Sequence, residues 1–271
     1  MKIFVCYHKK YPLCKSDVLT PIHVGKVKAK TDLGIIGDNT GDNISIKNPY
    51  FCELTVTYWI WKNVREDVVG LCHYRRYFNL KNEHTKTNKI TADFAKRLGN
   101  DTNTLSSILS KYDIVLPKKE KRNKYDSLYA YYTKKHEKKD LEDILNIIKE
   151  KYPNQYKTAK EILHNSIEGY YYNMIIAKKD VFDNYAKWLF DILFELEKQI
   201  QKDIEKRELY QQRVYGFLAE RMMTIWVALH PELKIKEVPV VFIEENKRKW
   251  YKYLFVCLTK KIFSIFRRKH G

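Results

Sequence analysis

Short apolar runs alternate with longer amphipathic stretches along residues 1–245 of the chain. The runs have the length and composition of buried strands, and they predict strands at residues 2–7, 20–24, 68–72, 113–116, 170–177 and 236–243. Apolar side chains at helical spacing predict helices at residues 51–63, 105–112, 127–163 (broken near Pro153), 181–205 and 213–230. This alternation predicts an α/β fold in which a mixed sheet is layered by helices.

The strand predicted at residues 68–72 ends in a polar and aromatic cluster. His73, Tyr74, Arg75 and Arg76 follow it directly. In open α/β sheets, ligands bind beyond the carboxyl ends of the strands. Arginine matches phosphate oxygens with paired donors and stays charged at physiological pH. The cluster therefore predicts a site for an anionic ligand such as a diphosphate, and the alternative is a surface ion-pair patch at the end of a core strand.

Net charge and cysteine usage narrow the class of protein. The chain carries 51 Lys or Arg and 33 Asp or Glu, which gives a net charge of +18. Its five cysteines form no C-x-x-C pair, so zinc and thioredoxin-like sites are disfavoured. The odd number of cysteines and the short first apolar run, which does not resemble a signal peptide, predict a cytoplasmic protein with reduced thiols.

Much of the positive charge lies in a C-terminal tail, residues 246–271. From Lys247 onward there are nine Lys or Arg and no acid, interleaved with aromatic and aliphatic side chains. The apolar stretches are too short to span a bilayer. A basic amphipathic helix of this kind is typical of segments that lie on an anionic membrane surface. A helix packed on the protein's own core and a nucleic-acid-binding arm are the alternatives.

Several longer motifs carry a family resemblance. They are Thr40–Ser45 with Asn48, Cys52–Thr55, Tyr58–Asn63, Gly70–Phe78, the Tyr-Tyr-Tyr-Asn-Met-Ile-Ile-Ala segment ending at Ala177, Trp188–Glu197 and Arg213–Arg221. Together they resemble a family of bacterial glycosyltransferases of capsular polysaccharide and O-antigen synthesis, formerly known only as a domain of unknown function. The resemblance covers residues 1 to about 245.

The resemblance implies a GT-A-like fold, a single α/β domain that binds a nucleotide sugar. It implies transfer of a sugar from a nucleotide-diphosphate donor, expected to be UDP-linked, to a lipid-linked glycan, with inversion. UDP-galactofuranose is a lead on the donor. The basic tail agrees with a peripheral position on the inner face of the bacterial cell membrane, and nucleic acid is not an expected partner. A non-catalytic scaffold of a polysaccharide assembly complex and a nucleic-acid-binding protein are the alternative functions.

Many GT-A enzymes hold a divalent metal with an Asp-x-Asp motif at a strand end, and this sequence has no such motif. We expect Arg75 or Arg76, with His73, to neutralise the diphosphate in its place. The expected cofactor is therefore none, and a Mn²⁺ or Mg²⁺ ion held by His73 and one carboxylate is the alternative.

Glu220 is the predicted catalytic base, because it lies in the region where inverting enzymes of this fold place that residue. A helix ion pair with Arg221 is the alternative role. Asp42, in a Gly-Asp-Asn loop, is the second candidate base, although such residues commonly cap turns. The expected donor contacts are Tyr7, His8, Asp42, Asn43, His73, Tyr74, Arg75, Arg76 and Asn173, the last placed within the tyrosine-rich strand at residues 170–177.

Overall fold

The computed structural model describes residues 1–82 and 89–243. The strands are β1 (Lys2–Tyr7), β2 (Leu19–His23), β3 (Val68–His73), β4 (Arg76–Phe78), β5 (Ile114–Pro117), β6 (Ile175–Lys178), β7 (Ile235–Val238) and β8 (Val240–Phe242). The α-helices are α1 (Asn48–Phe51), α2 (Leu54–Asn63), α3 (Phe94–Arg97), α4 (Thr102–Leu109), α5 (Leu128–Thr133), α6 (Lys138–Lys151), α7 (Pro153–Asn165), α8 (Lys179–Ile204) and α9 (Val214–Ala228). Three short 3-10 turns are η1 (Lys26–Lys28), η2 (Ser45–Lys47) and η3 (Gln211–Arg213).

The strands form one mixed sheet in the order β2-β1-β3-β6-β5-β7, and β4 and β8 extend it from β3. Strands β1, β2 and β3 are parallel, β6 is antiparallel to both β3 and β5, and β7 is parallel to β5. The carboxyl ends of β1, β2, β3, β5 and β7 therefore lie along the same edge of the sheet. Loops that follow these strands meet at that edge, where ligands of α/β proteins bind.

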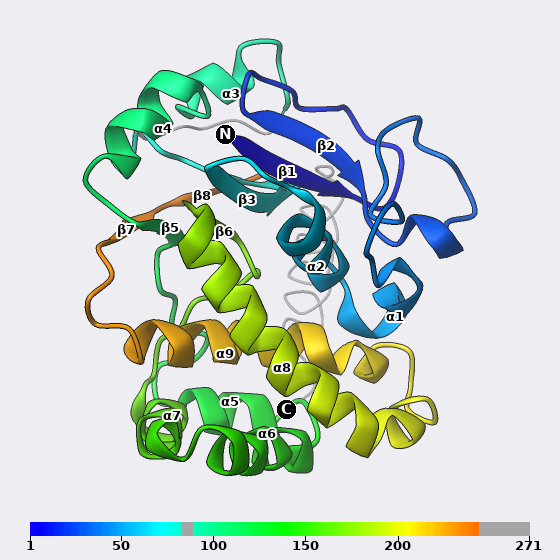
Figure 1. Cartoon of the computed structure of the whole chain (residues 1–271), viewed down its shortest axis with the longest axis vertical. Coiled ribbons are helices and arrows are strands. Elements are labelled where there is room, and N and C mark those ends of the chain that lie inside the picture. Colours follow the sequence, from blue (N-terminus) through cyan, green and yellow to red (C-terminus); the bar gives the residue numbers. More distant parts are fainter. Residues whose placement is uncertain (83–88, 244–271) are drawn as a thin grey trace, which may run out of the picture.

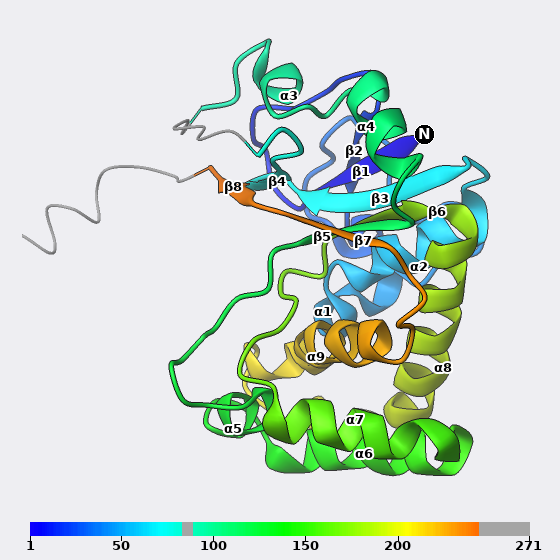
Figure 2. The same cartoon turned by 90° about the vertical axis from the view of Figure 1, so that its left-hand side faces the viewer.

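The helices are arranged in layers away from the sheet. Helices α2 and α8 both contact strand β3 of the sheet. Helix α8 also contacts α6, which lies away from the sheet (Figures 1 and 2). Figures 1 and 2 show α9 between the sheet and a far layer made of α5, α6 and α7. Buried side chains recur three or four positions apart along α8, as in Phe182, Tyr185, Leu189 and Leu193. This spacing gives the helix one continuous apolar face, which packs on its neighbours along its length.

Close packing in the middle of the sheet depends on Gly70 in β3. A Cβ atom at this position would lie 2.4 Å from the carbonyl oxygen of Ile175 in β6. The neighbouring side chains of β3, from Val68 to Cys72, are all buried. The absence of a side chain at Gly70 thus lets β6 approach β3 closely.

The predicted mixed α/β architecture is confirmed, with local corrections. The helix predicted at residues 127–163 has a second break, between α5 and α6. The helix predicted at residues 51–63 is two helices, because Cys52 has a left-handed φ of 53° between α1 and α2. The strand predicted at residues 170–177 begins only at Ile175, since Tyr172 and Asn173 form a left-handed turn with φ values of 76° and 51°. The strand predicted at residues 236–243 is divided at Pro239, which has no N–H for a sheet hydrogen bond.

The predicted membrane-binding tail, residues 246–271, lies outside the described residues. Its boundary with the α/β domain and its helical form therefore stay predictions. Within residues 1–82 and 89–243, no helix combines the length and apolar character that crossing a bilayer requires.

Candidate functional site

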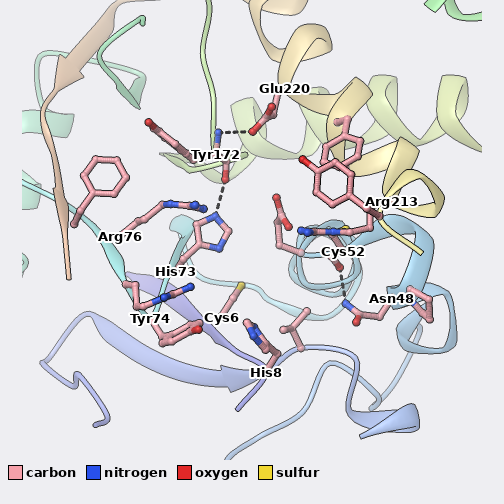
Figure 3. Close-up of a pocket in the computed structure, with 18 of the residues that line it drawn as sticks. Cys6, His8, Asn48, Cys52, His73, Tyr74, Arg76, Tyr172, Arg213 and Glu220 are labelled. Carbon is pink, nitrogen blue, oxygen red and sulfur yellow. Dashed lines mark hydrogen bonds between the residues drawn. The ribbon is translucent and has the colours of Figure 1, made fainter. Parts of the chain in front are cut away.

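A cavity of about 1060 Å³ opens at the carboxyl edge of the sheet. One wall is formed by the ends of strands and the loops that follow β1, β2, β3 and β5. It contains His8, Val24, His73 at the end of β3, Tyr74, Arg75, Arg76 at the start of β4, and Arg122. The segment from α1 to α2 and the start of α9 form the facing wall with Asn48, Cys52, Glu53, Arg213, Gly216, Phe217 and Glu220. Figure 3 shows His73 and Arg76 on one side of this cavity and Arg213 on the other.

Arginines dominate the charge of the cavity. The four that line it are Arg75, Arg76, Arg122 and Arg213, and the carboxylates on its wall are Glu53 and Glu220. Three of the guanidinium groups lie over aromatic rings. The distance from the central guanidinium carbon to the ring centroid is 5.1 Å for Arg75 and Tyr74, 4.9 Å for Arg76 and Tyr172, and 4.1 Å for Arg122 and Tyr171. Contact with a ring face limits the motion of a guanidinium and leaves donors at its edge for a ligand.

The histidines of the cavity are neutral at neutral pH. Burial lowers the pKa of His73 below its ordinary value. Burial, together with the nearby charges of Lys9 and Arg75, lowers the pKa of His8 in the same direction. Both imidazoles therefore lose their proton before neutral pH is reached, and the arginines supply the positive charge.

The left-handed turn at Tyr172 and Asn173 is held from two sides. His73 Nε2 donates to the carbonyl oxygen of Tyr172 at 2.6 Å, which joins the end of β3 to the turn. The backbone N–H of Tyr172 donates to Glu220 Oε1 at 3.0 Å, which joins the turn to α9. Non-glycine residues adopt this conformation only where the surroundings impose it, and such residues gather at functional sites.

Asn173 connects the same turn to the second carboxylate. Its Nδ2 atom donates to Glu53 Oε1 at 2.7 Å and to the carbonyl oxygen of Gly216 at 3.0 Å. The Asn173 side chain is buried, and its Oδ1 atom has no hydrogen-bond partner among the described residues. Asn173 thus fixes the position of Glu53 on the cavity wall.

Glu220 is oriented by two hydrogen bonds and is largely buried. Its Oε1 atom accepts from Tyr172, and its Oε2 atom accepts from Arg221 Nη1 at 2.8 Å. Burial raises the pKa of this carboxyl above its ordinary value, and Arg221 only partly opposes that shift. Glu220 therefore has the ion pair that the sequence offered as an alternative and also lines the cavity, as a base must.

The structure brings most of the predicted site residues together. His8, His73, Tyr74, Arg75, Arg76 and Glu220 line the cavity. Asn173 stands just behind the wall and contacts it through Glu53. Its predicted position within a strand is wrong, because it lies in the turn that precedes β6.

Besides Asn173, three predicted donor contacts are not among the residues that line the cavity. Tyr7 has no exposed surface, and its hydroxyl donates to the carbonyl oxygen of Pro12 and accepts from the N–H of Cys14, so it stabilises the loop after β1. Asp42 and Asn43 lie in an exposed loop, where Asp42 Oδ1 accepts from the hydroxyl of Tyr58 at 3.0 Å. The side chain and backbone of Asp42 therefore join its loop to Tyr58 and Asn63 of α2.

Glu53, Arg122 and Arg213 line the cavity but were not predicted as site residues. Arg122 lies in the loop that follows β5, as Arg75 lies in the loop that follows β3, so the rule applied to the one strand end would have found the other. Glu53 and Arg213 come from a helix junction and a helix start, which no strand-end rule includes. Their signal was membership in the motifs Cys52–Thr55 and Arg213–Arg221.

The donor set of the cavity fits an anion better than a metal ion. Across residues 1–82 and 89–243, no group of three or more His, Cys, Asp or Glu side chains is arranged to hold a metal. The Nε2 atom of His73 already donates to Tyr172. Guanidinium groups on several sides, by contrast, match the oxygens of a diphosphate.

Comparison with known proteins places the chain. The family described as "Domain of unknown function (DUF4422)" matches residues 2–231. The solved apo structure of the WbbM bifunctional glycosyltransferase is 34% identical, with a TM-score of 0.82, over 90% of this chain. The chain spans 45% of the length of that protein, and no curated protein matches. The fold of the described residues is thus GT-A-like and shared with a structure from a glycosyltransferase.

Proposed function

We propose that this chain, which belongs to the family described as Domain of unknown function (DUF4422), is a glycosyltransferase that uses a nucleotide-diphosphate sugar. The observation that carries the proposal is the arginine-lined cavity at the carboxyl edge of a GT-A-like sheet. Similarity to a structure from a bifunctional glycosyltransferase supports the reaction class.

In this proposal the arginines bind the donor diphosphate. Arg75 and Arg76 follow β3, Arg122 follows β5, and Arg213 faces them from the start of α9. When the bond from the anomeric carbon to the diphosphate breaks, negative charge develops on the departing oxygen. Fixed cationic donors at that oxygen stabilise the transition state more than the ground state.

Glu220 is the proposed base for the acceptor. The acceptor hydroxyl oxygen forms a bond to the anomeric carbon, the diphosphate leaves with the electrons of the broken bond, and the hydroxyl proton passes to Glu220. A carboxylate is suited to this role when burial raises its pKa toward the working pH. The hydrogen bonds from Tyr172 and Arg221 keep Glu220 in one orientation.

The finer identity of the substrates is part of the same proposal. The family resemblance carried by motifs such as Thr40–Ser45 and Gly70–Phe78 supports a lipid-linked glycan of capsule or O-antigen synthesis as the acceptor, and it offers UDP-galactofuranose as a lead on the donor. The basic sequence after Lys247 supports attachment to an anionic membrane surface.

A thermal-shift screen tests the proposed reaction class. The screen compares UDP-galactofuranose, UDP-galactopyranose, UDP-glucose and GDP-mannose. Duplex DNA at an equal concentration of phosphate groups is the control. A ligand at 100 times its Kd adds about 2.7 kcal/mol to the free energy of unfolding. We expect UDP-galactofuranose to raise the Tm most and DNA to leave it unchanged. A non-catalytic scaffold predicts no shift with any nucleotide sugar, and a nucleic-acid-binding protein predicts a shift with DNA alone.

A further inference from the structure

The loop that connects α8 to α9 presents apolar side chains to solvent. Leu209 is 83% exposed and Tyr210 is 58% exposed. Single exposed apolar residues are common and need no explanation. These two are adjacent in sequence, however, and Tyr210 lines the cavity. Tyr210 is thus both exposed and part of the cavity wall, which indicates a surface for a ligand.

An ion pair and two side-chain hydrogen bonds hold this loop in place. Arg207 donates to both carboxylate oxygens of Asp140, at 2.6 and 2.8 Å, and Asp140 is only 1% exposed. Gln212 Nε2 donates to the carbonyl oxygen of Arg207 at 2.9 Å. Gln211 Nε2 donates to the carbonyl oxygen of Lys135 at 2.9 Å. The exposed Tyr210 is therefore carried by a rigid loop, which lowers the entropic cost of binding a ligand to it.

The ring of Tyr210 belongs to an aromatic platform. Its centroid is 5.1 Å from that of Phe217, and the ring of Phe217 stacks on that of His136 at 4.3 Å. Tyr210 and Phe217 both line the cavity, and so does Arg213 between them in sequence. His136 thus backs the ring of Phe217, and the central guanidinium carbon of Arg213 lies 5.7 Å from the centroid of that ring. Tyr210 therefore supplies the exposed ring surface of the platform.

The cavity is wide enough for its strand ends and its helical wall to contact different parts of the substrates. Its volume of about 1060 Å³ lies at the upper end of the ~300–1,000 Å³ found for ligand pockets. Three of its arginines follow strands, whereas the platform belongs to the α8–α9 loop and α9. A donor diphosphate held at the strand ends therefore leaves the platform for another substrate.

We infer that Tyr210 and Phe217 form the subsite for the acceptor sugar, an inference that rests on the proposed glycosyltransferase function. The apolar C–H face of a pyranose or furanose ring packs on an aromatic face, and its hydroxyl groups reach polar side chains at the rim. Glu220, on the same helical wall, supplies an acceptor for those hydroxyls. The subsite brings the attacking hydroxyl to the proposed base.

The test compares Tyr210→Ala and Tyr210→Phe in the full chain, with Tyr125→Ala as the matched control. Tyr125 is 77% exposed and does not line the cavity. Octyl β-galactoside, octyl β-glucoside and octyl β-N-acetylglucosaminide are the acceptor probes. Their Kd values are measured by saturation-transfer NMR in the presence of UDP, and the Kd of UDP is measured by calorimetry.

We expect Tyr210→Ala to raise the Kd of the bound glycoside by roughly 10-fold, about 1.4 kcal/mol, because the sugar ring loses its aromatic contact. Tyr210→Phe and Tyr125→Ala should bind the glycoside like the wild type, and all variants should bind UDP equally. A wild type that binds UDP but none of the glycosides overturns the subsite. An equal loss of UDP affinity in Tyr210→Ala also overturns it, because the ring then stacks on the nucleobase. Failure of the wild type to bind UDP contradicts the proposed function itself.

Discussion

His73 Nε2 donates a hydrogen bond of 2.6 Å to the carbonyl oxygen of Tyr172, 99 residues further along the chain. This bond connects the end of a central strand to a left-handed turn that also contacts Glu220. Because a carbonyl oxygen only accepts, the proton of neutral His73 is on Nε2. His73 thus helps to build the cavity as well as line it, and it leaves the positive charge of the site to the arginines.

Packing at the centre of the sheet leads to a prediction about stability. Gly70→Ala should destabilise the protein by about 1–3 kcal/mol or more, because the new Cβ would clash with the backbone of β6 and force the strands apart. Gly34→Ala is the control, since no atom lies within 4 Å of that Cβ and only its φ of 66° is unfavourable. Urea unfolding measures both variants, and equal losses would show that β3 and β6 have room to separate.

The assignment of the base predicts a specific pattern of kinetic loss. Glu220→Gln should bind UDP-sugar like the wild type but lower kcat by on the order of 100- to 10,000-fold, as expected for loss of a general base. Burial places the pKa of Glu220 above its ordinary value of 4.5. The wild-type kcat should therefore fall, as the pH decreases, at a pH above 4.5, where Glu220 takes up a proton.

Glu53→Gln is the matched comparison, because both carboxylates line the cavity. If Glu53→Gln abolishes turnover while Glu220→Gln retains it and keeps the acid limb of the pH profile, the base is Glu53. The contact from Asn173 would then serve to aim the base.

The fold was largely predictable from sequence because its strands are buried and its long helices are amphipathic. Periodicity identified β1, β3, β5 and α8 close to their observed bounds. It misplaced the segment before β6, because three tyrosines and an asparagine resemble a strand when their surroundings are unknown. Contacts to Glu220 and His73, distant in sequence, favour the turn instead.

The candidate site was predictable where its residues follow strands. His73 and Arg76 met that condition, and the structure places them on the cavity wall. Glu53 and Arg213 reach the cavity through helix packing, which local patterns do not encode. The place of Asp42 outside the cavity lining was not predictable for a related reason, since the sequence does not show that its carboxylate accepts from Tyr58.

Diphosphate binding by arginine predicts that turnover does not require a divalent ion. Dialysis against EDTA should leave most of the activity, and added Mn²⁺ or Mg²⁺ should change it less than twofold, because guanidinium groups already supply the positive charge. Transfer rates before and after chelation give the result. Loss of turnover with EDTA and its recovery with Mn²⁺ would instead support a metal held by His73 and a carboxylate.

The C-terminal sequence predicts reversible membrane attachment. Nine basic residues from Lys247 onward, each worth about 1 kcal/mol at most near an anionic leaflet, favour adsorption. The full chain should sediment with anionic liposomes at low salt and detach at high salt. A chain that ends at Glu245 should remain in the supernatant and still bind UDP-sugar. Equal sedimentation of the two chains would show that the tail does not attach the protein to the membrane.

The most direct test of the central claim is calorimetric titration of UDP into the wild type, Arg76→Ala, Arg122→Ala and Arg97→Ala. Arg97 carries the same charge but pairs with Asp93 on α3 and does not line the cavity. We expect the two cavity variants to raise the Kd of UDP by roughly 10- to 100-fold, since charge-assisted hydrogen bonds contribute about 1.5–3 kcal/mol. Arg97→Ala should bind like the wild type. If UDP binds all four proteins equally, or none of them, the arginine-lined cavity is not a nucleotide-diphosphate site.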